Sequence, residues 1–150
     1  MSAIDHPDLP FLSHGHATLK DVDESILFYR NFLGLDVVKT SPRTLVARLG
    51  SNTVIVGVTL GEKGLAKAAR PWLENAHFGF DMAGADEVRE ARELALENQN
   101  EFQILHVGSL NMSDGGLSFM LTDQDGNFWE ILENPPGGYS GRFQGTCETG

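Results

Sequence analysis

Two histidines and one glutamate stand at positions where their side chains could share a metal ion. His14 and His77 each lie at the start of a stretch of alternating residues, and Glu130 stands among apolar neighbours in a third stretch. A carboxylate in such surroundings needs a partner, because an unpaired buried charge is costly or forces protonation. Two imidazoles and one carboxylate form a facial set of three ligands, suited to Fe²⁺, Mn²⁺, Zn²⁺ or Ni²⁺. Substrate oxygens would occupy the coordination positions of the ion that the protein leaves open.

The histidines of this set also have other interpretations. His16 shares a strand face with His14 and could be the ligand instead, although its spacing from the helix start at Asp21 favours His14. His77 could be an exposed residue at the beginning of a strand. The recurrence of a histidine at matching places in both halves of the chain favours the metal set.

Glu130 could alternatively form a structural ion pair with Arg48 or Arg142. Arg48, in an otherwise apolar strand, could hold an anionic substrate or extend to solvent. Tyr139 and Arg142 follow two glycines and could fold over a substrate as a lid, or belong to a disordered tail. His106 is a further candidate acid or base, although a lone strand histidine is often only structural.

The elements that must position these residues fall into two similar halves. In the first half, alternation over residues 13–19 predicts a strand with His14, His16 and Thr18 on a polar face. A helix then begins at Asp21 and ends at Gly34. The remaining predicted strands of this half are 36–40, 44–49 and 53–60, with a hairpin turn at 50–52.

The same pattern restarts at His77. A strand from this residue alternates polar and aromatic positions, and a helix over 86–98 follows. Its expected buried residues are Val88, Ala91, Leu94 and Ala95. The strands predicted after it are 102–107, 117–122 and 128–133, with a turn at 125–127. Residues 61–75 are expected to connect the halves, and residues 135–150 to form a tail.

This order of elements predicts an α+β fold of two βαβββ modules, about 12–60 and 76–134, within a single domain. Helices outside and sheets curved towards each other would form a cup, with the polar strand faces as its inner wall. In the last strand, Phe128 and Glu130 share one face, so Phe128 is expected to contact a bound substrate.

Charge and composition exclude several classes of function. The chain has 150 residues, with 11 Lys and Arg against 21 Asp and Glu, and a formal net charge of -10. This balance disfavours nucleic acid and anionic membrane surfaces as partners. The single cysteine, Cys147, cannot form an internal disulfide or a Cys-based metal site. Residues 1–10 do not resemble a secretion signal, so we expect a cytoplasmic protein.

Several segments resemble the vicinal oxygen chelate superfamily, which includes glyoxalases, one-metal epimerases, fosfomycin-modifying enzymes and extradiol ring-cleaving dioxygenases. The first is His14-Gly-His-Ala-Thr-Leu-Lys-Asp21, continuing through Phe28-Tyr29 and Leu33-Gly34. The others are His77-Phe-Gly-Phe and Asp123-Gln-Asp-Gly-Asn-Phe-Trp-Glu130-Ile-Leu. The resemblance implies a glyoxalase/dioxygenase-like fold and one divalent ion held by His14, His77 and Glu130.

Departures from the family pattern bear on the reaction. Four-ligand glyoxalases take a further carboxylate from the last strand of the first module, and residues 53–60 contain none. Extradiol dioxygenases place a tyrosine ten residues before the glutamate, where this chain has Met120, so ring cleavage would need His106, His16 or Tyr139 as the acid. The ligand count favours dioxygenase-type chemistry, with glyoxalase-like lyase or isomerase chemistry as the alternative.

The resemblance also allows a protein without catalysis. Some superfamily members lack a metal and sequester drugs such as bleomycin, and this chain could bind a drug or metabolite in the same way. In either case a small molecule is the expected partner, with Arg48, Met120, Phe128 and Arg142 as candidate contacts. A homodimer is expected, because open module edges in a small chain invite pairing.

Overall fold

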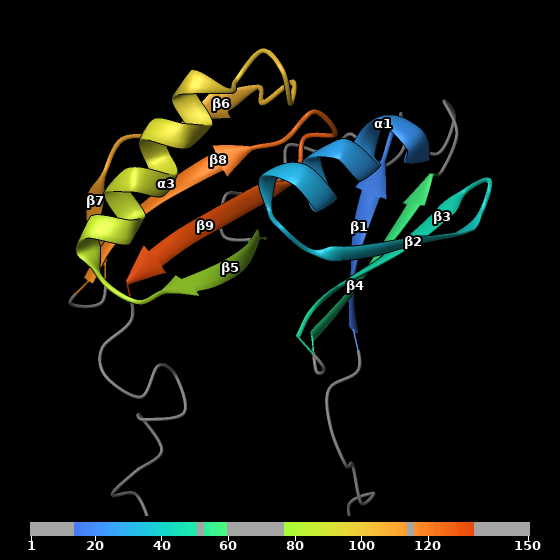
Figure 1. The fold of residues 1–150 in the computed structure, drawn as a ribbon, viewed down its shortest axis with the longest axis horizontal. Helices are drawn as coiled ribbons and strands as arrows, with labels where there is room; N and C mark the ends of the chain where they lie inside the picture. Colours follow the sequence, from blue (N-terminus) through green and yellow to red (C-terminus); the bar gives the residue numbers. More distant parts are fainter. Residues whose placement is uncertain (1–13, 51–52, 60–76, 114–115, 134–150) are drawn as a thin grey trace, which may run out of the picture. The chain divides into compact units, whose positions relative to one another are not determined.

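The computed structural model describes residues 14–50, 53–59, 77–113 and 116–133. The chain divides into two compact units, Met1–Leu60 and Gly61–Gly150. Each unit contains one sheet, and helical segments pack against one face of it (Figure 1). No described helix has the length and apolar character needed to span a membrane.

The first unit has a four-stranded sheet. Its elements are β1 (His14–Leu19), α1 (Val22–Leu27), η1 (Phe28–Phe32), β2 (Asp36–Ser41), β3 (Thr44–Leu49) and β4 (Thr53–Thr59). The strand order is β1-β4-β3-β2. The strands β1 and β4 are parallel, and the other neighbours are antiparallel. The predicted strands of this half are therefore confirmed.

The predicted helix start and stop of the first unit are also confirmed. The Asp21 carboxylate accepts a hydrogen bond from the Glu24 backbone N–H at 3.0 Å, which satisfies a donor at the helix start. Gly34 has a φ of 68°, the left-handed conformation that ends many helices. The last turn is a π-helix, which the periodicity did not distinguish, and the Leu33 N–H donates to the Phe28 carbonyl at 3.0 Å.

Alternation along the strands separates the two faces of this sheet. One face packs against α1 and η1 and forms the core of the unit; its buried residues include Ala17, Leu19, Leu45, Ala47 and Ile55 from the strands and Val22, Phe28 and Tyr29 from the helices. The other face carries His14, His16 and Thr18, as the sequence predicts. Folding thus presents both histidines on the side of the sheet away from its helices.

The second unit repeats this plan with one additional short strand. Its elements are β5 (His77–Met82), α3 (Ala85–Glu97), β6 (His106–Val107), β7 (Asn111–Ser113), β8 (Gly116–Thr122) and β9 (Phe128–Glu133). The strand order is β5-β9-β8-β6, and β7 also pairs with β8. The strand β5 is parallel to β9, as β1 is to β4 in the first unit. The α+β fold with two similar modules is confirmed, and the cup remains a prediction.

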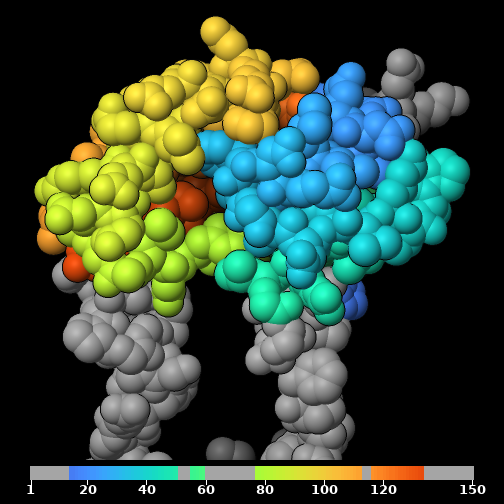
Figure 2. Space-filling model, in the orientation of Figure 1, coloured from blue at the N-terminus to red at the C-terminus, as the bar shows by residue number. Residues whose placement is uncertain are grey.

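The core of the second unit lies between the sheet and α3. Trp129, Phe119 and Leu121 are fully buried on the sheet, and Val88 and Ala95 are fully buried on α3. Figure 2 shows the atoms of α3, in yellow-green, in front of the orange and red strands.

The prediction that Leu94 is a buried residue of α3 is wrong. Leu94 is 50% exposed. Successive helical residues are rotated by about 100°, so Leu94 lies about 100° from Ala95 and about 120° from Val88, outside the buried stripe. Arg92 is only partly exposed and donates to the Gly108 carbonyl at 2.8 Å.

The strand predicted over 102–107 is reduced to the two residues of β6. The chain first makes a turn after α3, in which the Ile104 N–H donates to the Gln99 carbonyl at 2.9 Å. Gln103 takes a positive φ of 52°, which interrupts extended structure. The short strand β7 was not predicted at all. In contrast, the turn before β9 is confirmed, with Gly126 at a φ of 85°.

Candidate metal centre

The side chains of His77 and Glu130 contact each other on neighbouring parallel strands. His77 Nε2 lies 3.0 Å from Glu130 Oε2, and the side chains are 28% and 15% exposed. In the strand register, His77 is opposite Phe128, and Glu130 is opposite Gly79. The two side chains therefore meet diagonally across the paired strands, on one face of the sheet. The structure thus brings two of the three predicted metal ligands together.

Other candidate residues lie on the same face of this sheet, because residues paired across strands project to the same side. Met120 is directly opposite Glu130, and Thr122 is opposite both Phe128 and His106. His106 therefore shares a face with His77 but lies three strands away, about 14 Å at the usual strand spacing. This distance is too long for His106 to bind an ion held by His77.

Three residues of this face were not among the sequence-based candidates. Gly79 and Asp81 follow His77 at alternate positions of β5, and Thr122 lies between His106 and Phe128. The signal that could have identified them is the strand alternation itself, since it places every second residue beside the candidate ligands. Gly79, Asp81 and Thr122 therefore lie on the same sheet face as His77 and Glu130.

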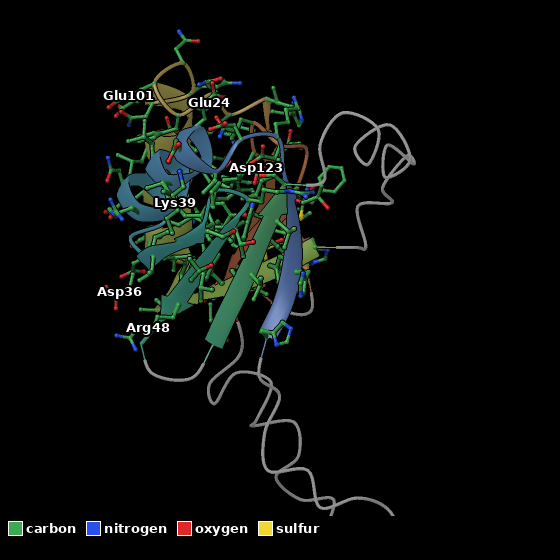
Figure 3. All side chains as sticks on the ribbon, turned by 90° about the vertical axis from the view of Figure 1, so that its right-hand side faces the viewer. Glu24, Asp36, Lys39, Arg48, Glu101 and Asp123 are labelled. Carbon is green, nitrogen blue, oxygen red and sulfur yellow. The ribbon has the colours of Figure 1, made fainter. Side chains whose placement is uncertain are left out.

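In the first unit, the open face of the sheet carries His14, His16 and Arg48. The two imidazole rings have centroids 5.1 Å apart and are tilted by 57°. Arg48 Nε lies 3.4 Å from Asp36 Oδ2, and both side chains are exposed (Figure 3). The partner of Arg48 is thus Asp36, while that of Glu130 is His77.

The strand registers of the two units show which residue of the first unit corresponds to each residue of the second. His14 is opposite Val54 on β4, as His77 is opposite Phe128 on β9. Counting on by two residues, His16 corresponds to Gly79, and Val56 corresponds to Glu130. His14, rather than His16, therefore occupies the place of His77. The same comparison puts an apolar valine where a fourth ligand would stand.

The donor atoms of His77 and Glu130 fit a divalent cation. The 3.0 Å between His77 Nε2 and Glu130 Oε2 is a hydrogen-bond distance, and it also matches two ligand atoms about 2.1 Å from an octahedral ion and about 90° apart. Imidazole nitrogen and carboxylate oxygen suit the borderline divalent metals. Among the residues that the structure describes, no group of three or more His, Cys, Asp or Glu side chains lies close enough to hold a metal ion.

The turn that leads into the Glu130 strand contains a buried carboxylate. Asp123 is fully buried, and burial raises its pKa from 3.8 to about 6, although the hydrogen bond from Trp129 opposes this rise. Tyr139 and Arg142, the remaining sequence-based candidates, lie outside the described residues.

Known proteins share this architecture. The family model for the Glyoxalase/Bleomycin resistance protein/Dioxygenase superfamily matches residues 11–131. Similar solved structures include a lactoylglutathione lyase from Agrobacterium tumefaciens, with 20% identity, a TM-score of 0.60, and 85% of this chain and 96% of that chain covered. A glyoxalase/dioxygenase from Nostoc punctiforme has 18% identity and a TM-score of 0.64, with 90% and 99% covered.

A possible glyoxalase from Bacillus cereus has 17% identity and a TM-score of 0.64, with 83% of this chain and 99% of that chain covered. No curated protein matches the chain. At these identities the solved structures show the fold alone, whereas the family model covers most of the sequence. The resemblance to the vicinal oxygen chelate proteins is thereby confirmed, and the chain belongs to the Glyoxalase/Bleomycin resistance protein/Dioxygenase superfamily.

Proposed function

We propose that this protein is a divalent-metal-dependent enzyme that binds two neighbouring oxygens of a small substrate. The proposed ligands are His14, His77 and Glu130. The observation that carries the proposal is the 3.0 Å contact between His77 Nε2 and Glu130 Oε2. When bound, a divalent ion at this place supplies Lewis-acid stabilisation for negative charge that develops on substrate oxygens.

The protein's own residues would orient the substrate around this centre. Met120 and Phe128 lie beside Glu130 and His77 on the same sheet face, so they offer apolar contacts to the carbon skeleton of a substrate. Thr122 adds a hydroxyl that can donate a hydrogen bond. His106, exposed on β6, can exchange protons with solvent and with the far end of a bound substrate.

Among reactions of the superfamily, we favour dioxygenase-type chemistry of the extradiol kind. The support is the ligand count. Val56 occupies the place in the first unit that Glu130 occupies in the second, so a further carboxylate ligand is missing there. Two histidines and one carboxylate leave room for a bidentate substrate and for dioxygen.

The runner-up is glyoxalase-like lyase or isomerase chemistry. Met120, which replaces the tyrosine of ring-cleaving relatives, lies directly opposite Glu130. A thioether cannot transfer a proton, so ring cleavage would depend on a more distant acid such as His106. An isomerisation that moves a proton along a chelated substrate does not require an acid at the position of Met120. One similar structure is named a lactoylglutathione lyase, in keeping with this alternative.

A metal-free binding protein is the alternative of a different class. Such a protein would have no use for paired metal-ligating side chains, which is why the His77–Glu130 contact favours an enzyme. The homodimer and the cytoplasmic location expected from the sequence remain predictions.

Activity measurements on metal-loaded protein separate these functions. Oxygen uptake with catechols is the expected result for the dioxygenase, and isomerisation of a thiohemiacetal would support the runner-up. The Glu130→Gln variant should lose the activity, and Glu101→Gln, which removes a carboxylate from an exposed turn, should keep it. Tight binding of a small molecule by metal-free protein, without turnover, would contradict the enzyme proposal.

A further inference from the structure

The turn between β8 and β9 is built around the Asp123 carboxylate. Asp123 Oδ1 accepts hydrogen bonds from the backbone N–H groups of Asp125 at 2.8 Å and Asn127 at 3.0 Å. Asp123 Oδ2 accepts one from the indole Nε1 of Trp129 at 2.8 Å. Both oxygens of a fully buried carboxylate are therefore used, one for the turn and one for the strand that follows.

The indole of Trp129 connects this turn to the strand of His77. Trp129 is fully buried, and its ring stacks against Phe78 and Phe80 of β5, with centroid distances of 5.4 and 5.7 Å. Each of these rings is the immediate neighbour of a residue on the open face. Phe78 follows His77, and Trp129 precedes Glu130. The aromatic cluster thus lies on the reverse side of the strand pair that carries the candidate ligands.

Because the aromatic cluster holds β9 against β5, it also fixes which residues of the two strands meet at the candidate metal centre. Neighbouring residues of a strand project to opposite faces, and a slip of one residue would move every side chain to the other face. Glu130 meets His77 only while β9 keeps its present register against β5. The indole is held by its ring faces on β5 and by its N–H on Asp123, so both contacts oppose a shift of β9.

The internal repeat provides a comparison within the chain. In the first unit, Ile55 occupies the place of Trp129, and its side chain has no N–H to donate. That unit has Val56 where the second unit has Glu130. The polar contact between the turn and the strand therefore occurs in the module that has to hold two candidate ligands against each other.

We propose that Asp123 is a positioning residue, which acts through Trp129 to keep the Glu130 carboxylate beside the His77 imidazole. The inference rests on the proposed function, because it concerns the same metal centre. A residue that orients a metal ligand from behind changes metal affinity about 10- to 100-fold when it is replaced. A residue that only stabilises the fold changes the unfolding midpoint and leaves the affinity of the folded protein unchanged.

The test uses two variants that disrupt the same hydrogen bond from opposite sides. Trp129→Phe keeps an aromatic ring and removes the N–H, and Asp123→Asn keeps an acceptor for the turn and places an amide donor next to the indole. Asp125→Asn is the matched control, because it removes a carboxylate from the same turn and leaves the acceptor of Trp129 in place. Co²⁺ affinity is measured by absorption titration at pH 7, and urea unfolding verifies that each variant is folded there.

We expect the Co²⁺ affinity to fall about tenfold in Trp129→Phe and in Asp123→Asn, and to stay within twofold in the control. The double variant should be no weaker than either single variant, because both remove one interaction. Co²⁺ affinities within twofold of the original protein in both single variants would overturn the proposal, even if the urea midpoints fall.

A second measurement separates failure of this inference from failure of the proposed function. Nuclear Overhauser contacts between the His77 ring and the Glu130 side chain are measured in metal-free protein. If the original protein binds no Co²⁺, the proposed function fails, and the positioning role still predicts that these contacts weaken in both variants and not in the control. Unchanged contacts in both variants would contradict the positioning role.

Discussion

His77 and Glu130 are joined diagonally across two parallel strands, with 3.0 Å between Nε2 and Oε2. Gly79 is directly opposite Glu130, so Glu130 is offset from His77 by two residues along the paired strands. In the first unit the same diagonal runs from His14 to Val56 and contains only one metal-ligating group. The duplicated module therefore places one candidate ligand in its first copy and two in its second.

The register of the repeat predicts different metal affinities for variants of His14 and of His16. Since His14 corresponds to His77, the His14→Ala variant should lose divalent metal affinity by at least about 100-fold. His16 corresponds to Gly79, and His16→Ala should stay within about threefold of the original. Isothermal titration with Zn²⁺ measures both affinities. A larger loss in His16→Ala than in His14→Ala would show that the other histidine of β1 is the ligand.

His106 is expected to act on protons and not on the metal. General acid or base catalysis by one side chain contributes about 100-fold or more, so His106→Gln should lower kcat by about that factor. The KM and the bound metal should stay nearly unchanged, as steady-state kinetics and metal analysis would show. An unchanged kcat would exclude His106 as the proton-transfer group.

The sequence predicted most of the fold because local signals were strong and mutually consistent. The helix start at Asp21, the left-handed stop at Gly34 and the alternation after His77 each specify structure within a few residues. The failures have non-local causes. Leu94 is exposed because the buried stripe of α3 runs through Val88 and Ala95, and the strand before β6 is shortened by a turn at Gln103.

For the candidate site too, some features could be predicted from the sequence and others could not. Alternation predicted which face Glu130 and Phe128 share, and the recurrence of histidine predicted His77 as its partner. The role of Gly79 and the contact between Asp123 and Trp129 depend on strand register and on a turn, which a single sequence does not specify. These are the features that the structure adds.

The buried carboxylate of Asp123 predicts a characteristic pH dependence of stability. Burial raises its pKa from 3.8 to about 6, while the Trp129 hydrogen bond opposes and the Asp125 charge reinforces the rise. The folded state then binds more protons than the unfolded state between these values, so the stability contribution is complete below pH 4 and is lost as the pH rises through 6. A shift of this size corresponds to about 3 kcal/mol.

Urea unfolding of the original protein and of Asp123→Asn between pH 4 and pH 8 measures this contribution. The difference in unfolding free energy should change by about 3 kcal/mol in favour of the variant as the pH rises, because the asparagine carries no charge to bury. Parallel pH curves for the two proteins would show that Asp123 has an ordinary pKa in the folded state.

Gly79 is expected to keep the approach to Glu130 open. A Cβ added there would lie 3.3 Å from Leu132 Cδ2, a close contact with a movable side chain, and the corresponding position of the first unit accommodates His16. Gly79→Val should therefore fold, keep its metal, and raise the KM by about tenfold as the side chain occupies substrate space. Steady-state kinetics with measured metal content would reveal this, and an unchanged KM would place the substrate elsewhere.

Metal stoichiometry and affinity test the central claim most directly. The original protein, loaded with Fe²⁺, Mn²⁺, Zn²⁺ or Ni²⁺ and freed of excess, should hold one ion per chain for at least one of these metals. His14→Ala, His77→Ala and Glu130→Gln should each lose it, while His106→Gln and Glu101→Gln retain it. An original protein that binds none of the four ions, or one whose affinity survives loss of His77 and Glu130, would contradict the proposed metal centre.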